Sequence, residues 1–353
     1  MKNRCWHIIS LLAVALTMLT ACDVHELPRV PEKVPFVLRL NYETDLPKWE
    51  HERGKRTIKA VQYSGVMRYV IRAYSKNPLL NSTSPYAEEF VFMRNLSDGY
   101  NCEFTLSLIP DDYDIQVWSD MMPSYSDTPF YNVDNFRQIT VQGDHVGNSD
   151  YRDAFRGYSE VSLIADIYDN KMQVKDVAMQ RPMAKFELIT NDLNEFIVKE
   201  VNRLTRGEPT RGPEDPKTRV NLDSYKVIFY YSAYMNEFNM FRDKPVDVAY
   251  GISFESKIKQ MSDKEASLGF DYVFVNGADA SVDVSVGIYS ESGEQLSLTN
   301  PIEVPLLRSH HTILRGSFLM HQASGGVVID PSFDHDINIV IPADPDNSST
   351  TID

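Results

Sequence analysis

The feature that most constrains the fold is the alternation of apolar and polar residues in short segments along almost the whole chain. In residues 36–42 the apolar side chains fall on one face, Phe36, Leu38, Leu40 and Tyr42. Successive side chains of a strand point to opposite faces, so such a segment predicts a strand with one buried face. Many short strands separated by turn residues are typical of β-sandwiches. The sequence therefore predicts an all-β fold.

Further segments with strand character are 66–74, 89–94, 103–109, 113–119, 160–168, 173–178, 186–190, 225–234, 249–255, 270–276, 281–290, 302–307, 311–319 and 337–341. The turn residues Pro110, Asp111 and Asp112 predict a tight antiparallel connection between two of these strands. Two exceptions to the β pattern are predicted. Residues 193–204 have apolar residues at helical spacing and predict a short amphipathic helix, and residues 151–158 predict a single helical turn.

A break in the pattern at Arg181-Pro182-Met183-Ala184-Lys185 suggests where one domain ends. Pro182 cannot donate to a strand ladder, which suits an edge or a change of domain. We therefore expect two tandem β-sandwich domains, 34–180 and 181–342. Residues 205–219 contain three prolines and no large apolar residue, so they should form an exposed insertion. Residues 343–353 form a polar tail.

The N-terminus predicts export. Lys2 and Arg4 precede an apolar run over residues 6–19, shorter than the roughly 20 residues that span a bilayer. The sequence Leu19-Thr20-Ala21-Cys22 has a small-residue site before a cysteine and resembles the lipobox of bacterial lipoproteins. This resemblance implies that residues 1–21 are a signal peptide and that Cys22 is acylated, giving a stable membrane anchor. An ordinary secretory cut and a short membrane anchor are the alternatives. Residues 22–33 would form a tether.

Charge and cysteine content limit the partners and the source of stability. Removing residues 1–21 leaves 332 residues and changes the formal net charge from −15 to −17, because Lys2 and Arg4 are lost and no acid is lost. Such an acidic chain disfavours nucleic acid and anionic lipid surfaces as partners. Cys102 is then the remaining thiol and cannot form an internal disulfide. We expect it to be a buried structural residue.

No compact catalytic, cofactor or metal motif stands out. Gly325-Gly326 lacks the Lys-Ser/Thr of a P-loop and the three-glycine dinucleotide pattern. Two clusters contain residue types that can bind metal ions: His310, His311 and His321, and Asp330, Asp334 and Asp336. Neither has zinc or EF-hand spacing, so we expect surface or strand-edge histidines and turn-forming aspartates. No cofactor and no metal are predicted, and the chain is not predicted to be an enzyme.

Aromatic residues leave a binding role open. Trp49, Trp118 and the tyrosines could stack on sugar rings, although packing in the core or on a sheet face is the favoured interpretation. The alternative functions are therefore a surface glycan-binding lipoprotein and, with less support, a hydrolase whose carboxylates the sequence does not single out.

Several segments together resemble the fimbrillin superfamily of Bacteroidales, the lipoprotein precursors of surface pili. They are the lipobox and residues 109–120 (IPDDYDIQVWSD), 151–155 (YRDAF), 181–188 (RPMAKFEL) and 312–319 (TILRGSFL). The resemblance implies two transthyretin-like β-sandwich domains, no active site and a function in assembly. It also implies a lipid-anchored position at the outer membrane, other pilus subunits as partners through strand exchange, and a host or bacterial surface ligand as a further partner.

In stalk members of that superfamily a protease cuts after Arg or Lys, the first strand leaves, and a strand of the next subunit takes its place. Carried onto this chain, the leaving strand would be residues 36–42 and the cut would follow Arg53 or Arg56. Arg206 and Arg211 lie in a loop that should be equally exposed. Residues 336–342 would supply a single strand at the C-terminus with no second apolar run. Stalk, anchor and accessory roles all stay open.

Overall fold

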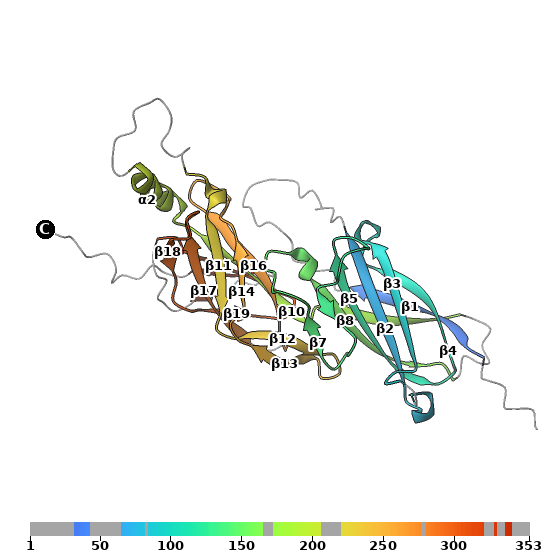
Figure 1. Ribbon diagram of the computed structural model, residues 1–353. Helices are drawn as coiled ribbons and strands as arrows, with labels where there is room; N and C mark the ends of the chain where they lie inside the picture. The colour runs from blue at the N-terminus through green and yellow to red at the C-terminus, as the bar shows by residue number, and fades with distance from the viewer. Residues whose placement is uncertain are drawn as a thin grey trace, which may run out of the picture.

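The computed structural model describes residues 32–42, 65–81, 84–164, 172–205, 220–276, 280–320, 328–329 and 336–340. Strands dominate these residues, which confirms the predicted all-β fold of sandwich type. Figure 1 shows two β-structures arranged end to end along the long axis of the molecule. We call the part built on the seven-stranded sheet the first lobe, and the part built on the six- and five-stranded sheets the second lobe.

The first lobe consists of β1 (Val34–Tyr42), β2 (Val66–Ser75), β3 (Glu88–Asn95), β4 (Cys102–Leu108), β5 (Asp112–Met122), β8 (Ala154–Ser162) and β9 (Gln173–Gln180). Their order in the sheet is β3-β2-β5-β8-β9-β1-β4. Strands β8 and β9 pair only at Arg156 with Gln180 and Gly157 with Met179. This short pairing is a corner at which the sheet folds into two layers, β3-β2-β5-β8 and β9-β1-β4.

The two layers of the first lobe share one core. Tyr69 of β2 lies 5.0 Å from Phe104 of β4, and Tyr42 of β1 lies 4.9 Å from Phe155 of β8, between ring centroids. The corner requires a glycine, because a Cβ at Gly157 would approach the Met179 Sδ to 2.5 Å. The alternation of the sequence thus supplies the inward faces of both layers.

The second lobe packs two sheets and a helix around a second core. The six-stranded sheet contains β15 (Lys259–Gln260), β16 (Ala266–Phe274), β10 (Met183–Thr190), β20 (His311–Gly316), β22 (Asp336–Val340) and β21 (Val328–Ile329), in that order. The other sheet contains β14 (Ser253–Ser256), β11 (Lys226–Tyr231), β17 (Ala280–Tyr289) and β18 (Gln295–Leu298), with β19 (Ile302–Leu306) also paired to β17. Helix α2 (Leu193–Thr205) confirms the predicted helix and buries Leu193 and Phe196 against this core.

A smaller sheet joins the lobes, and we call it the bridging sheet. Its strands are β13 (Lys244–Ala249), β12 (Tyr234–Asn239), β7 (Ile139–Val141) and β6 (Tyr131–Asn132), in that order. Strands β7 and β12 pair at Glu237 with Thr140 and at Phe238 with Ile139. Chain segments from before and after residue 180 therefore hydrogen-bond in one sheet. Under it lies a third apolar cluster that includes Val70 and Trp118 of the first lobe and Phe274 of the second.

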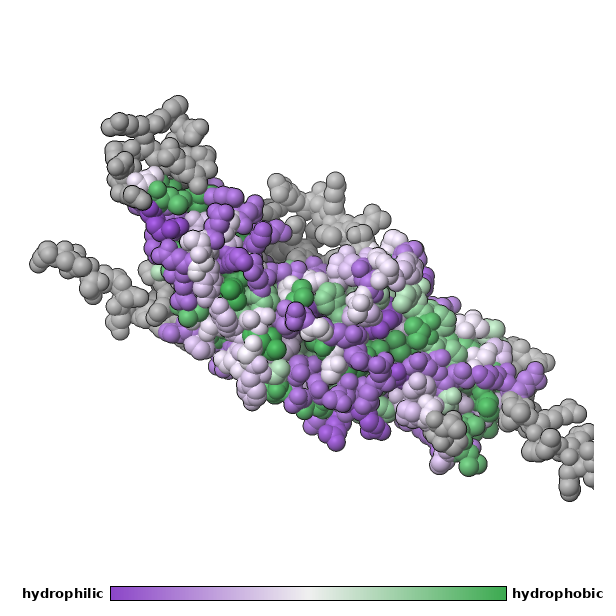
Figure 2. Space-filling model, viewed as in Figure 1, coloured by the Kyte–Doolittle hydropathy of each residue, from purple (hydrophilic) through white to green (hydrophobic). Residues whose placement is uncertain are grey.

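The short 3-10 helices of the described residues are Pro78–Asn81, Leu96–Asp98, Asp150–Arg152 and Leu222–Ser224. The surface seen in Figure 2 is mostly polar with smaller apolar patches. This fits a chain that places its apolar faces in the three cores.

Two local predictions are wrong, and a third, the helical turn at residues 151–158, holds only at its start, where the 3-10 helix Asp150–Arg152 lies. Strands β4 and β5 are not a hairpin: β4 pairs with β1 and β5 with β2 and β8, so residues 109–111 cross between the two layers. Residues 151–158 continue from the 3-10 helix into β8, and residues 249–255 contain a turn between β13 and β14 with Gly251 at φ 70°. The sequence did not predict the short strands β6, β7, β12, β13, β15, β18 and β21. Pro182 lies between β9 and β10, and the domain boundary near residue 180 stays a prediction.

Candidate assembly strand and lobe junction

Strand β1 occupies an interior position in its layer. It pairs antiparallel with β4 from Val34 with Leu108 to Leu40 with Cys102. On its other side it runs parallel to β9, from Phe36 with Gln173 to Tyr42 with Met179. Both backbone edges of β1 are therefore paired, although it is the first strand of the described chain.

The inner face of β1 is deeply buried. Phe36, Leu38 and Leu40 are 0% exposed and Tyr42 is 7% exposed. Burying one such side chain contributes about 1.5–3 kcal/mol, so these four contribute roughly 6–12 kcal/mol. Loss of β1 would expose a matching apolar groove in the first lobe, and only a strand with the same alternation could fill it.

The outer face of β1 is held by exposed polar contacts. Arg39 Nε lies 2.7 Å from Glu103 Oε1, and Asn41 Nδ2 donates to Asp176 Oδ1 at 2.9 Å. Exposed ion pairs of this kind contribute little to stability. At its end, the Tyr42 hydroxyl lies 2.8 Å from Ser119 Oγ inside the core, and burial raises the pKa of Tyr42. The apolar face and the two ladders thus hold β1 in place.

The residues that the sequence predicts for lipidation and cleavage lie outside the described part of the chain. These are Cys22, Arg53 and Arg56, and the same holds for Arg206, Arg211, Trp49, His321, Asp330 and Asp334. Lipidation of Cys22 and cleavage at either arginine therefore stay predictions. The backbone of Asp336 belongs to β22.

Three other sequence interpretations can be judged. Cys102 is buried, as expected, and burial raises the pKa of its thiol. Trp118 is fully buried beside Tyr131 at 5.4 Å, so it packs in the core and offers no surface for a sugar. His311 is buried rather than exposed, because β20 lies between β10 and β22. Burial lowers the pKa of His311 to about 3.

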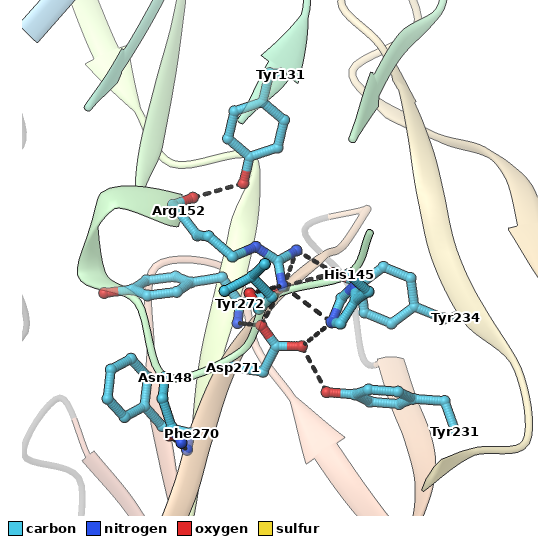
Figure 3. A network of polar contacts seen from close by, with 10 residues as sticks. Tyr131, His145, Asn148, Arg152, Tyr231, Tyr234, Phe270, Asp271 and Tyr272 are labelled. Atoms are coloured by element: carbon cyan, nitrogen blue, oxygen red, sulfur yellow. Dashed lines mark hydrogen bonds and ion pairs between the residues drawn. The ribbon is translucent and has the colours of Figure 1, made fainter. Parts of the chain in front are cut away.

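A network of polar side chains lies at the junction between the lobes (Figure 3). Arg152, from the 3-10 helix that precedes β8, places its Nη1 2.5 Å from Asp271 Oδ1 on β16. Arg152 Nη2 donates to the Tyr234 hydroxyl at 2.6 Å, and Tyr231 donates to Asp271 Oδ2 at 2.6 Å. The Nε2 of His145 lies 2.7 Å from the same carboxylate oxygen.

Arg152 and Asp271 are an almost completely buried ion pair, with side chains 1% and 0% exposed. Burial alone would raise the pKa of Asp271. The Arg152 guanidinium and the contact with His145 have the opposite and larger effect, so the pKa of Asp271 is lowered overall. The carboxylate therefore stays charged beside the arginine. A buried pair of this kind is costly to break, because removing one partner leaves the other charge uncompensated.

Sequence reasoning did not find this network. Its members are far apart in the chain, at positions 145, 152, 231, 234 and 271, and come from both lobes. Arg152 stands in the quoted segment YRDAF, but nothing there names Asp271 as its partner. The network is enclosed by aromatic rings, such as Tyr234 at 4.5 Å from His145 between ring centroids. It joins the lobes rather than forming an open catalytic site.

Among the described residues, no group of three His, Cys, Asp or Glu side chains is placed to hold a metal ion. In the same part of the chain, no helix combines the length and the apolar character needed to cross a membrane.

Comparisons with known proteins give one family. The family described as "Family of unknown function (DUF6562)" matches residues 31–352. A search of curated proteins gives no match.

Several solved structures are similar at low identity. A candidate polysaccharide-binding protein (DUF1812) from Bacteroides thetaiotaomicron has a TM-score of 0.40 and 10% identity, covering 75% of this chain and 79% of that chain. A candidate adhesin from Bacteroides ovatus has a TM-score of 0.42 and 8% identity, covering 88% and 90%. The fimbrial anchor protein Mfa2 from Porphyromonas gingivalis has a TM-score of 0.37 and 13% identity, covering 75% and 82%.

Proposed function

The chain belongs to the family of unknown function DUF6562, and we propose that it is a structural subunit, anchor or accessory component of a cell-surface fimbria that assembles by β-strand addition. It acts without catalysis, and its partners are other subunits of the same fimbria. A lipid on Cys22 would hold it at the outer membrane.

The position of β1 is the observation that carries the proposal. Strand β1 lies between β4 and β9, so its loss would leave a slot with one edge for an antiparallel strand, on β4, and one for a parallel strand, on β9. Among the described strands β4 pairs only with β1, so without β1 it would be held by its side chains Phe104, Leu106 and Leu108, which are buried in the core. Backbone groups of such edges bind an incoming strand through ladder hydrogen bonds, and pockets for alternate side chains select its sequence. The sequence resemblance to fimbrillins supports the same interpretation.

The slot sets strict requirements on a donor strand. The donor must run antiparallel to β4 and parallel to β9, and it must present four apolar side chains at alternate positions. A donor shifted by one residue would turn its polar side chains into the core, so register is strongly specified.

Limited proteolysis tests the proposal on the purified lipid-free mature chain. Trypsin cleavage after Arg53 or Arg56 should release the fragment that contains β1, and mass spectrometry after size-exclusion chromatography would detect its loss. The emptied groove should then either drive oligomer growth or bind an added synthetic peptide of residues 34–42 (VPFVLRLNY). A matched control peptide with Leu38→Asp and Leu40→Asp keeps the backbone groups but removes the apolar face, and it should not bind.

A variant with Gln at every Lys and Arg of residues 43–64, which are Lys48, Arg53, Lys55, Arg56 and Lys59, controls for the site of cleavage, and it should keep β1 and stay monomeric. If the cut wild-type chain keeps its fragment through chromatography, stays monomeric and takes up neither peptide, assembly by strand addition at this slot is refuted.

A further inference from the structure

A cleft of about 350 Å³ lies between the bridging sheet and the second lobe, away from β1. Strands β12, β13, β16, β17 and β19 all contribute to its lining. The volume is within the range of about 300–1,000 Å³ that ligand pockets occupy. The cleft is thus large enough for a small ligand and is formed where separate sheets meet.

The lining of the cleft divides into an apolar base and a polar rim. Buried apolar residues form the base, among them Phe274, Val282 and Leu306. Exposed polar residues of the rim include Lys244 and Asp283. A base that excludes water, with a few polar groups around it, is the usual composition of a small-molecule site.

The charges of the rim favour an uncharged ligand. Lys244 and Asp283 have opposite charges, so their formal charges cancel. The strongly acidic chain, with a net charge of −15, repels anions in general. A cationic ligand would be repelled by the ammonium group of Lys244 at the rim. The ligand that best fits is neutral and rich in hydroxyl groups that can bond to both an ammonium and a carboxylate.

Tyr250 adds an aromatic surface at the cleft. It follows directly after β13 and is 76% exposed, the second-largest exposure among the large apolar side chains of the described residues. An exposed tyrosine presents an apolar ring face together with a polar hydroxyl. A sugar ring has the matching pair of surfaces, an apolar C–H face and a hydroxyl edge.

An added β-strand fits the cleft less well. The adjacent strand β13 is an edge strand of the bridging sheet, but it contains Pro245 and the charged residues Lys244 and Asp247. Proline and charges on an edge strand oppose pairing with another chain.

From this lining we infer that the cleft between β12–β13 and β16–β17 is a binding site for a neutral saccharide, with Tyr250 stacking on a sugar ring and Lys244 and Asp283 bonding to its hydroxyls. The inference does not depend on the proposed strand exchange, because no residue of β1, β4 or β9 lines the cleft.

Calorimetric titration of the purified mature chain tests the inference, with cellobiose, maltose, lactose and chitobiose as neutral probes and digalacturonic acid as an acidic one. At least one neutral probe should bind. Tyr250→Ala should weaken that binding about tenfold, the value of one well-placed aromatic contact. Ser281→Trp, at an exposed position in the lining, should block the cleft and abolish binding.

Tyr125→Ala is the matched control, because Tyr125 is 54% exposed and does not line the cleft; it should leave binding unchanged. Circular dichroism would establish that each variant is folded. The inference is overturned if no neutral probe binds, if only digalacturonic acid binds, or if both Tyr250→Ala and Ser281→Trp bind as tightly as the wild type.

Discussion

The junction between the lobes should depend strongly on one carboxylate. Asp271→Asn keeps the size of the side chain but removes its charge, and it leaves the buried Arg152 without a counter-ion. Because the amide presents one acceptor and one donor group, it cannot serve all the donors that now surround the carboxylate.

The magnitude follows from the contacts of Asp271. Its two oxygens lie 2.5 Å from Arg152 Nη1, 2.7 Å from His145 Nε2 and 2.6 Å from the Tyr231 hydroxyl, and it also accepts from its neighbouring backbone N–H. Breaking one partner of a buried pair costs about 3–5 kcal/mol. We expect Asp271→Asn to lower the free energy of unfolding by that amount.

Urea unfolding at about pH 7, followed by circular dichroism and by the fluorescence of buried Trp118, measures the change. Asp176→Asn is the control, because Asp176 is 58% exposed and pairs with Arg39 at 3.7 Å; its effect should stay below about 1 kcal/mol. If Asp271→Asn changed the free energy of unfolding no more than Asp176→Asn, the reasoning that the buried pair is decisive for the junction would be refuted.

Three further predictions concern the cores. His311 has a pKa of about 3 in the folded chain and 6.5 in the unfolded chain, so the free energy of unfolding falls as the pH drops from 6.5 towards 3. Between about pH 7 and about pH 4.5, urea unfolding should show this decrease to be about 2–3 kcal/mol smaller for His311→Gln than for the wild type. An equal decrease in both proteins would contradict this. Cys102 should react with a disulfide reagent only when the chain unfolds, because burial shields the thiol and raises its pKa; fast reaction of the native chain would disprove it. Gly157→Ala should lower the free energy of unfolding by about 1–3 kcal/mol in thermal or urea melts, because its Cβ would meet Met179 and Val177, and a neutral effect would mean that the corner can relax.

Many of the strands were predictable because the alternation of apolar and polar residues within a short segment is enough to indicate a strand. The alternation in Phe36, Leu38, Leu40 and Tyr42 predicted both the strand and the face that it buries, and these side chains are buried. The same holds for the helix α2, whose apolar residues recur at helical spacing. The backbone geometry of a strand or a helix fixes which residues share a face. The spacing of apolar residues can therefore be interpreted without knowing which other elements pack against that face.

What the sequence could not reveal is which strands become neighbours. The turn at Pro110 predicted a hairpin, yet its two strands lie in different layers, because a turn constrains only the local direction of the chain. Likewise, strand character at residues 36–42 does not say that β1 is enclosed between β4 and β9.

The candidate sites divide in the same way. Sequence alone determined the charge, the number of cysteines and the fimbrillin-like segments, because these depend on residue identity. Tertiary structure alone decided that His311 is buried, that Arg152 meets Asp271, and that residues of five strands line one cleft. Burial and pairing depend on contacts between residues that are far apart in the chain, such as Arg152 and Asp271 at 119 positions, and no local pattern encodes them.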